Sequence, residues 1–403
     1  MRNVPKLRFK EFSGDWEEIK LKQILEFKNG INASKEQYGK GIKFINVLDI
    51  LNNDFITYDN IIGKVDIDEK LLDKYSVNYG DILFQRSSET REEVGMANVY
   101  LDNKIATFGG FVIRGKKIGN YVPTFINKVL KTNLARNEII SKSGGSTRYN
   151  VGQDILNEVR IIIPNMQEQE KIADFLSSVD KKIAITEEKL DLFKDYKKGI
   201  MQKIFKQELR FKDSNGNDYP EWEEKRLGDV FSFKQGYQIP FKEQIKTKEK
   251  GYVRYLYISD FFSDKNLLYV KDDGKEKITE TDITVANTGN TAGSFYRGKS
   301  GILSNNMFNI QNDEKVVTND FLFQFLGTSL YSNQLKTFFN SSGQPHLGHK
   351  NMSMIIINYP ISFEEQQKIV DFLSSIDNKI DNLATELKNL KEFKKGLLQQ
   401  MFI

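Results

Sequence analysis

The sequence predicts an α+β protein that is built twice within one chain. Stretches of the first 200 residues recur in the second 200, and each copy ends in a long amphipathic helical pattern. The rest of each copy consists of short β-forming runs separated by Gly, Asn and Asp turns. We therefore expect two mixed α/β domains with much strand, each followed by a long helix, over residues 1–163, 164–206, 207–359 and 360–403.

The duplication is clearest at the two ends of each copy. The matched stretches are LRFK at 7–10 and 209–212, GDWEE at 14–18 and PEWEE at 220–224, and KIADFLSSVDKKI at 171–183 and KIVDFLSSIDNKI at 368–380. The only two tryptophans, Trp16 and Trp222, hold matching places, and we assign both to domain cores. Residues 30–140 and 237–340 share little beyond strand-like spacing. This combination suits one scaffold that presents two different recognition surfaces.

Each long helix has a marked start and an apolar seam. Asn165 followed by Glu168, and Ser362 followed by Glu365, fit capping boxes. Beyond them, apolar residues recur at heptad spacing. The predicted seam positions are Ile172, Leu176, Val179, Ile183, Leu190 and Phe193 in the first helix, and Ile369, Leu373, Ile376, Ile380, Leu387 and Leu390 in the second.

Two such seams in one chain predict an antiparallel coiled coil with pseudo-two-fold symmetry. In a register where paired positions sum to 573, Ile172 meets Met401. The seam lysines Lys197 and Lys394 then fall beside Asp377 and Asp180, which would neutralise them. The alternative is that both lysines extend to water.

The helices are long enough to act as a spacer. About 35 residues at ~1.5 Å each give a rod of roughly 50 Å, comparable to ~15 base pairs of duplex DNA at 3.4 Å each. Such a rod would hold two recognition domains at a set distance. A plain packing or dimerisation helix is the alternative.

Composition excludes several kinds of site. The chain has no cysteine and only two histidines, His346 and His349, which rules out thiolate chemistry and histidine-rich metal centres. No two prolines are adjacent, so the Pro-Pro motif of an amino-methyltransferase is missing. The start has no apolar signal-peptide core and no run approaches a membrane span, so we expect a cytoplasmic protein without a membrane contact.

Positive charge is concentrated locally rather than in the total, which is +4. Between residues 104 and 148, nine Lys or Arg stand against one acid, Glu138. In the second half, basic residues gather at 242–254, with a weaker set at Arg297 and Lys299. Basic stretches interleaved with Tyr, Asn, Ser and Gly suit contact with phosphates and base edges, although lysine-rich loops are often only solvated.

One motif suggests a nucleotide site. GSFYRGKS at 293–300 fits the phosphate-binding loop pattern G-x-x-x-x-G-K-[ST]. Such a loop needs a following helix N-terminus, but GILSNN is a poor helix start. We predict a strand, turn, strand here and no nucleotide binding.

Taken together, these residues resemble the DNA specificity subunits of type I restriction-modification systems. The resemblance covers essentially the whole chain and rests on the doubled helix starts PNMQEQEKIADFLSSVDKKI and PISFEEQQKIVDFLSSIDNKI, the paired W-E-E-x-x-L openings, YGDILFQR at 79–86, and SSGQPHLGHKNMSMIIINYP at 341–360. The first half departs at the last motif and the second half departs at YGDILFQR, so contacts tied to these motifs do not transfer between halves.

The resemblance implies a non-catalytic subunit with two target recognition domains. Each would read one half of a split, asymmetric site on double-stranded DNA, and the helices would set the gap between the half-sites. Two methyltransferase subunits using S-adenosylmethionine would dock on the helices, and two restriction subunits using ATP and Mg would complete the complex. No cofactor or metal is expected in this chain. The alternatives are a protein-binding coiled-coil scaffold and an NTPase that uses Lys299.

Candidate DNA contacts follow strands and turns in both halves. In the first half they are Gln85, Arg86, Ser87, Arg91, Lys116, Lys117, Thr147, Arg148, Tyr149 and Asn150. In the second half they are Lys246, Lys248, Asn287, Thr288, Asn290, Arg297, Lys299, Gln344, His346 and Lys350. Each of these positions has an alternative role as a turn former or a solvated charge.

Overall fold

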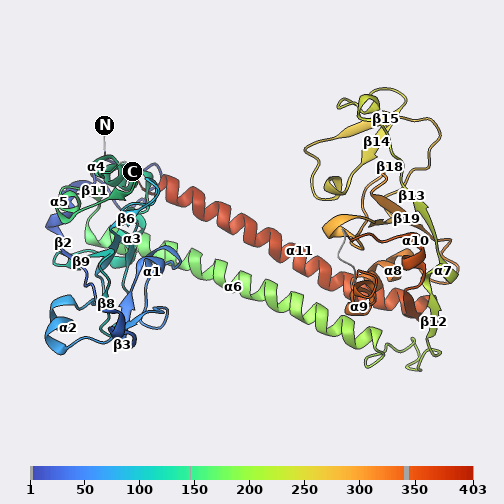
Figure 1. Cartoon of the computed structure of the whole chain (residues 1–403), viewed down its shortest axis with the longest axis horizontal. Helices are drawn as coiled ribbons and strands as arrows, with labels where there is room; N and C mark the ends of the chain where they lie inside the picture. The colour runs from blue at the N-terminus through green and yellow to red at the C-terminus, as the bar shows by residue number, and fades with distance from the viewer. Residues whose placement is uncertain (1–2, 146, 340–344, 403) are drawn as a thin grey trace. The chain divides into compact units, whose positions relative to one another are not determined.

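The chain divides into two compact units, each with its own domain and one end of both long helices. The fold is described from a computed structural model, which describes residues 3–145, 147–339 and 345–402. Unit 1 contains Met1–Glu187 and Glu386–Ile403, and unit 2 contains Glu188–Thr385. The long helices are α6, Met166–Phe205, and α11, Phe363–Gln400 (Figure 1).

Unit 1 is built around a four-stranded antiparallel sheet with the order β2-β9-β5-β7. A second sheet has the order β4-β3-β8, and the pairs β1-β11 and β10-β6 complete the strand structure. The strands are β1 Glu17–Lys20, β2 Leu25–Asn29, β3 Tyr38–Ile45, β4 Lys64–Val65, β5 Ile82–Gln85, β6 Ser87–Ser88, β7 Ala97–Val99, β8 Thr107–Phe108, β9 Val112–Lys117, β10 Tyr149–Asn150 and β11 Arg160–Ile163. The shorter helices are α1 Val47–Leu51, α2 Glu69–Tyr75, α3 Pro123–Val129, α4 Asn133–Lys142 and α5 Gln153–Asn157.

Unit 2 repeats this plan. Its sheets have the orders β13-β19-β16-β17 and β15-β14-β18, with the pair β12-β20 beside them. The strands are β12 Glu223–Arg226, β13 Ser232–Gln235, β14 Tyr252–Leu256, β15 Leu268–Lys271, β16 Ile283–Ala286, β17 Phe295–Tyr296, β18 Ile302–Leu303, β19 Met307–Gln311 and β20 Ile356–Tyr359. The helices are α7 Leu227–Val230, α8 Asn319–Leu326, α9 Ser329–Lys336 and α10 His349–Ser353.

Matched glycines show that the two sheets share one backbone frame. A Cβ on Gly30, just after β2, would lie 2.1 Å from the carbonyl oxygen of Gly109. A Cβ on Gly236, just after β13, would lie 2.1 Å from the carbonyl oxygen of Ser304. Both turns therefore require glycine because another strand passes too close for a side chain. The predicted mixed α/β architecture with much strand is confirmed in both units.

The stretch that fits the phosphate-binding loop pattern, residues 293–300, lies in a strand, turn, strand, as predicted. Gly293 precedes β17, and residues 297–301 turn the chain into β18 without a helix. A Cβ on Gly293 would meet Leu335 of α9, just as one on Gly95 would meet Ile139 of α4. Both glycines have a positive φ. The first glycine of the motif is thus a packing position that both units share.

Both tryptophans pack against the end of a long helix. In unit 1 the ring centre of Trp16 lies 6.5 Å from that of Phe402 at the end of the chain. In unit 2 the ring centre of Trp222 lies 6.2 Å from that of Phe205 at the end of α6. Trp16 is buried and Trp222 is partly buried, so both serve core packing as expected.

The helix starts carry a contact that the capping-box interpretation did not foresee. Asn165 accepts a hydrogen bond from the amide of Glu168 at 3.0 Å, as an N-cap should. The Glu168 carboxylate does not turn back to the cap. It is fully buried and accepts two hydrogen bonds from Arg8 at 2.7 Å and one from the indole of Trp16 at 3.3 Å.

Unit 2 has the same buried cluster. Arg210 donates to the buried Glu365 carboxylate at 3.2 and 3.0 Å, and the Trp222 indole donates to it at 3.1 Å. The following glutamines are also matched: the Nε2 amides of Gln169 and Gln366 donate to the carbonyls of Pro164 and Pro360, both at 2.9 Å. The repeated LRFK, W-E-E and EQ motifs therefore supply the residues that attach each domain to the start of its long helix.

Within each unit the two long helices pack through their seams. In unit 1, Ile172, Leu176, Val179 and Ile183 share a core with Leu387, Leu390, Leu397 and Met401. In unit 2, Ile369, Leu373, Ile376 and Ile380 share a core with Phe193, Ile200 and Ile204. Leu190 is also buried.

The seam lysines are neutralised as the antiparallel register predicts. Lys394 lies 2.7 Å from Asp180 in unit 1, and Lys197 lies 2.6 Å from Asp377 in unit 2. Because the start of α6 meets the end of α11 in unit 1, the helix segments run antiparallel there. The alternative, in which both lysines extend to water, is not what the structure shows.

Candidate nucleic-acid interface

In unit 1, several predicted contact residues meet where β5 ends. The amide of Arg86 donates to the carbonyl of Phe111 at 2.9 Å, and its own carbonyl accepts from the amide of Val151 at 3.0 Å. These bonds fix the backbone on both sides and leave the Arg86 side chain exposed, with one long contact of 3.4 Å to the Gly110 carbonyl. A guanidinium presented in this way is free to contact a guanine edge or a phosphate.

The neighbouring strands β6 and β10 bring the two predicted clusters together. Ser87 stands opposite Asn150, and its hydroxyl donates to the Asn150 side-chain oxygen at 2.5 Å. The Asn150 amide nitrogen donates to the Arg148 carbonyl at 3.0 Å. Arg148 is exposed and lies 3.7 Å from Glu89. The structure therefore joins two groups of candidate residues that are about 60 positions apart in sequence.

Unit 2 uses the same backbone bonds with different side chains. The amide of Asn287 donates to the carbonyl of Asn306 at 2.9 Å, and its carbonyl accepts from the amide of Leu347 at 2.8 Å. Thr288 then pairs with His346 in an antiparallel bridge. Asn287, Thr288 and His346 thus hold the places that Arg86, Ser87 and Asn150 hold in unit 1.

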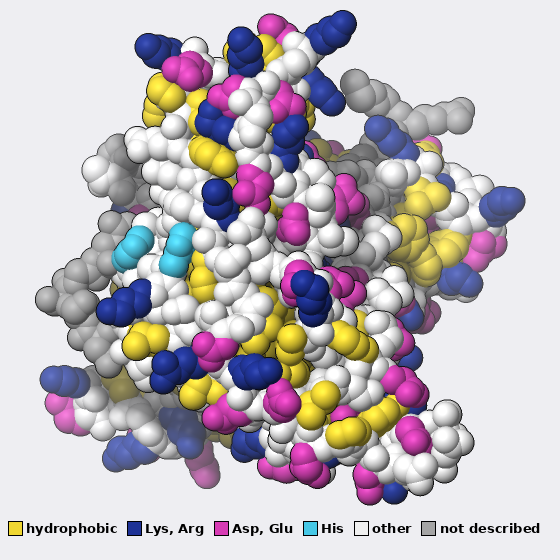
Figure 2. All heavy atoms as spheres, turned by 90° about the vertical axis from the view of Figure 1, so that its right-hand side faces the viewer, with side chains coloured by type: hydrophobic (Ala, Val, Ile, Leu, Met, Phe, Trp, Pro, Cys, Tyr) yellow, Lys and Arg dark blue, Asp and Glu magenta, His cyan; other side chains and the backbone are white. Residues whose placement is uncertain are grey.

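The unit 2 surface carries exposed polar and basic side chains. His346 and Asn290 are exposed, and so is Lys350, in the short helix α10. Figure 2 shows the two histidine side chains near each other on one face, with a Lys or Arg side chain beside them. The ring of His349 lies 5.0 Å from that of Phe308, and burial lowers the pKa of His349. His349 is therefore neutral at pH 7 and contributes packing rather than charge.

Several candidates lie elsewhere or are engaged within the protein. Gln85 is buried, and its amide donates to the Ser87 carbonyl at 2.9 Å. Lys116 and Lys117 lie at the opposite end of β9 from Gln85, whose partner in that strand is Val112. Gln344 lies outside the described residues. Arg91, Thr147, Lys246 and Lys248 are exposed, and Tyr149 is partly buried beside Ser88.

The two basic residues of the phosphate-loop motif are held by acids. Arg297 pairs with Asp320 at 2.5 Å and covers the ring of Phe323 at 3.9 Å. Lys299 pairs with Asp264 at 2.9 Å. Neither residue is presented to a phosphate by a helix N-terminus, which agrees with the prediction that this motif does not bind nucleotide.

The basic excess between residues 104 and 148 does not form a single surface. Arg114 and Arg136 are buried, and Lys128 pairs with Asp180 at 2.8 Å. Lys142 pairs with Glu138 at 2.9 Å. Because long cationic side chains also stabilise packing, a linear count of charges overestimated the surface that is available here.

Phe111 was missed by the sequence reasoning. It is 65% exposed at the turn between β8 and β9, and its carbonyl holds the Arg86 backbone. Asn306 takes its place in unit 2. The turn residues of FGGFVI at 108–113 and LSNNMF at 303–308 are the only sequence signal for this pair.

No group of three or more acidic or histidine side chains is placed to hold a metal ion within residues 3–145, 147–339 and 345–402. Among the helices described there, none is long and apolar enough to cross a membrane. The fold and the two matched loops define a duplicated protein whose halves display different side chains on one backbone frame.

Comparison with known proteins identifies the family. The chain matches the type I restriction modification DNA specificity domain twice, over residues 13–193 and 219–392. It belongs to this family. The chain is 25% identical to the putative type I restriction enzyme MjaX specificity subunit of Methanocaldococcus jannaschii over 420 residues, which cover 98% of this chain and 95% of that protein.

Two further likenesses agree with the family. The MjaVIII specificity subunit of the same organism is 32% identical over 208 residues, which cover 50% of this chain and 47% of that protein. This chain therefore spans about half the length of that relative. The S subunit of a type I restriction-modification system from M. genitalium has a similar structure, with a TM-score of 0.59, 17% identity and 99% coverage of both chains. That likeness shows the fold.

Proposed function

We propose that each unit reads one half of a bipartite, asymmetric DNA site, as the specificity subunit of a type I restriction-modification complex. One observation carries this proposal: the loops after β5 and β16 share their backbone hydrogen bonds but differ in the side chains they display. Arg86 and Asn150 in unit 1, and Thr288 and His346 in unit 2, offer different hydrogen-bonding patterns. Different hydrogen-bonding side chains on the same backbone structure suit the recognition of two DNA half-sites with different sequences.

The long helices would set the spacer and dock the other subunits. Their neutralised seam pairs, Lys394 with Asp180 and Lys197 with Asp377, support a firm pairing of the two helices within each unit. In this proposal the chain itself is not catalytic. Two methyltransferase subunits would supply S-adenosylmethionine-dependent adenine methylation, and two restriction subunits would supply the ATP- and Mg-dependent motor and nuclease.

The other candidate functions have less support. A scaffold that binds only proteins would not need unlike polar loops at two equivalent positions. An NTPase would need Lys299 free, but this lysine pairs with Asp264.

The experiment is sequencing of N6-methyladenine in cells that carry the chain with its methyltransferase partner. An Arg86→Ala, Asn150→Ala variant should relax only one half of the methylated motif. A Thr288→Val, His346→Ala variant should relax only the other half, because each base contact discriminates by about 1–3 kcal/mol. Lys315→Gln, an exposed residue paired with Asp313, is the control and should leave the motif unchanged. A motif that either variant alters in both halves would contradict the proposal.

A further inference from the structure

Four basic side chains gather on unit 1 where the β2–β9 sheet meets the end of α2. Lys28 in β2 stands opposite Arg114 in β9, and Lys116 follows two residues later on the same face. Lys74, at the end of α2, completes the group. The Nζ atoms of Lys28 and Lys74 lie 4.9 and 5.9 Å from the centre of the Tyr75 ring. We call Lys28, Lys74, Arg114 and Lys116 the basic ledge.

The charges of the basic ledge are only partly matched by acids: Asp81 and Glu26 act on Arg114 electrostatically, but neither forms an ion pair with it. Within the described part of the chain, no carboxylate lies within ion-pair distance of Lys28, Lys74, Arg114 or Lys116. Glu26 stands opposite Lys116 in the sheet but makes no ion pair with it. Burial, followed by the charges of Lys74, Arg114 and Lys116, lowers the pKa of Lys28 by more than the charge of Glu26 raises it. Like charges held this close repel one another unless an anion lies between them.

Arg114 is the most unusual member. Only 5% of it is exposed, one of its terminal nitrogens donates to the Ser76 carbonyl, and its Nε atom is buried without a partner. Its guanidinium also lies over the ring of Phe108, with 5.5 Å to the centroid. Asp81 and Glu26 offset part of this charge from a distance, but a buried arginine without a carboxylate in direct contact is still costly to the fold. It therefore calls for an explanation outside core packing.

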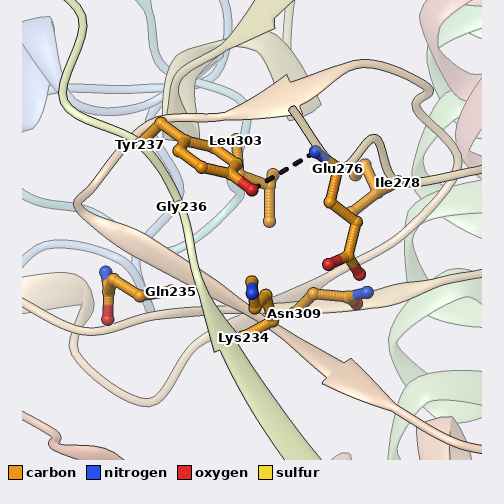
Figure 3. A pocket seen from close by; sticks show the side chains of 8 residues that line it. All are labelled: Lys234, Gln235, Gly236, Tyr237, Glu276, Ile278, Leu303 and Asn309. Carbon is orange, nitrogen blue, oxygen red and sulfur yellow. Dashed lines mark hydrogen bonds between the residues drawn. The ribbon is translucent and has the colours of Figure 1, made fainter. Parts of the chain in front are cut away.

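Unit 2 shows that the fold does not require these charges. The register of β13 with β19 places Lys234 opposite Asn309, where unit 1 has Lys28 opposite Arg114. Gln311 stands in the place of Lys116, and Glu276 in the place of Tyr75. Gln311 donates to Glu276 at 2.6 Å. Figure 3 shows the shallow pocket here, which Lys234, Glu276 and Asn309 help to line.

The acids of unit 2 also neutralise the remaining lysine. Lys275, the counterpart of Lys74, pairs with Asp273, and the neighbouring Lys277 pairs with Asp272 at 2.6 Å. At matching backbone positions, unit 1 therefore carries four basic side chains that form no ion pair with any described residue, whereas unit 2 carries two lysines, Lys234 and the paired Lys275.

We propose that the basic ledge binds phosphate groups of the DNA backbone beside the half-site that unit 1 reads. This inference rests on the proposed function. Arg114 lies three residues along β9 from Phe111, whose carbonyl holds Arg86. At about 3.3 Å per residue this is roughly 10 Å, or about three base pairs of duplex. Base contacts at Arg86 and phosphate contacts at the ledge thus fit one DNA segment.

The test uses the full chain, in complex with its methyltransferase partner, and duplex DNA of about 30 base pairs. A Lys28→Gln, Lys74→Gln, Lys116→Gln variant should lower the slope of log affinity against log salt by about one per lysine. Binding to target and to unrelated duplex should weaken by the same factor, because phosphates carry no sequence information.

The matched control is Lys275→Gln, Lys277→Gln, Lys315→Gln, which removes the same charge from lysines that are already paired with acids. Its salt slope should equal that of the wild type. Equal slopes for the ledge variant and the wild type, or an equal loss in the control, would overturn the inference while leaving the proposed function intact. A wild-type complex that does not bind DNA would overturn both.

A second variant tests whether a loss of salt dependence could come from misfolding rather than from the lost charges. Arg114→Asn with Lys116→Gln introduces the residues that unit 2 already carries at these positions. Its thermal unfolding should match the wild type or exceed it, while its salt slope still falls. A variant that folds and retains the full slope would count against the basic ledge.

Discussion

At the scale of single residues, the most informative feature is the buried carboxylate at the start of each long helix. Glu168 is fully buried and held by Arg8 and Trp16, which lie more than 150 positions away in sequence. The two tryptophans were predictable as core residues because they hold matching places in the two copies. The role of Glu168 was not, because a glutamate at the third helical position also fits a local capping box. Only tertiary structure separates the two roles.

We predict that Glu168→Gln destabilises unit 1 by about 3 kcal/mol or more, because it leaves the largely buried Arg8 charge without a carboxylate partner. The measurement is urea unfolding followed by tryptophan fluorescence in a Trp222→Phe background, in which Trp16 reports on unit 1 alone. Glu187→Gln, which breaks an exposed pair with Lys391, is the control and should change stability by less than about 1 kcal/mol. A Glu168 variant as stable as this control would show that the buried cluster is dispensable.

The candidate contact residues divide along similar lines. The sequence identified Arg86, Ser87 and Asn150 because they sit among turn-forming and polar residues, and the structure joins them. Gln85 looked equivalent, but the alternation of a strand turns its side chain inward. Lys28 and Lys74 were overlooked because each stands alone in sequence, and only the sheet register brings them together.

At the scale of elements, heptad spacing predicted the helices well because it reflects a local rule. The helix bounds Met166–Phe205 and Phe363–Gln400 follow the cap residues and the apolar seam. The pairing of Lys394 with Asp180 also followed from the seam register. The strand pairings did not follow in this way, because two-residue strands such as β6 and β10 have no periodicity of their own. Their partners are set by tertiary contacts, such as the hydrogen bond from the Val151 amide to the Arg86 carbonyl.

Mutation of Asp180 and mutation of its partner Lys394 should change the stability of unit 1 by different amounts. Asp180 pairs with Lys128 at 2.8 Å and with Lys394 at 2.7 Å. Asp180→Asn should destabilise unit 1 by about 1–3 kcal/mol, because it leaves two partly buried lysines without their carboxylate partner. Lys394→Met should stay within about 1 kcal/mol of the wild type, because Asp180 retains Lys128 and methionine suits an apolar seam. The measurement is denaturant unfolding of both variants, and the reverse ranking would contradict this account.

The same pair predicts a pH dependence. Burial alone would raise the pKa of Asp180, but its pairing with Lys128 and Lys394 outweighs burial, and the pKa lies below its usual value. The stabilisation is therefore present above the unfolded-state pKa of about 4 and disappears as pH falls through the lower folded-state value. The Asp180→Asn variant should lack this part of the acid-induced loss of stability.

At the scale of the whole molecule, duplication was the most predictable property, because repeated motifs are visible without any structure. What the sequence did not reveal is how far the repeat extends into the divergent regions. The glycines Gly30 and Gly236, and the backbone bonds of Arg86 and Asn287, repeat the frame where the sequences share almost nothing. Backbone geometry tolerates most side-chain changes, so the frame persists while the surface residues differ.

The proposed spacer role leads to a prediction about the methylated motif. Seven residues that continue the heptad, inserted after Glu187 in α6 and after Thr385 in α11, preserve the seam in both helices. They lengthen each helix by about 10 Å, which corresponds to about three base pairs. Methylome sequencing should find the same two half-sites with a spacer about three base pairs longer.

The level of methylation should fall at the same time. Three extra base pairs rotate one half-site relative to the other by roughly a third of a helical turn, and the two units would have to rotate by the same angle to bind both half-sites. Insertion into α6 alone is the control. It shifts the seam of one helix against the other and should abolish methylation of both spacers. If the complex with both insertions still methylates sites with the original spacer length, the helices do not set the distance between the half-sites. This conclusion would not depend on which base sequences the two units recognise.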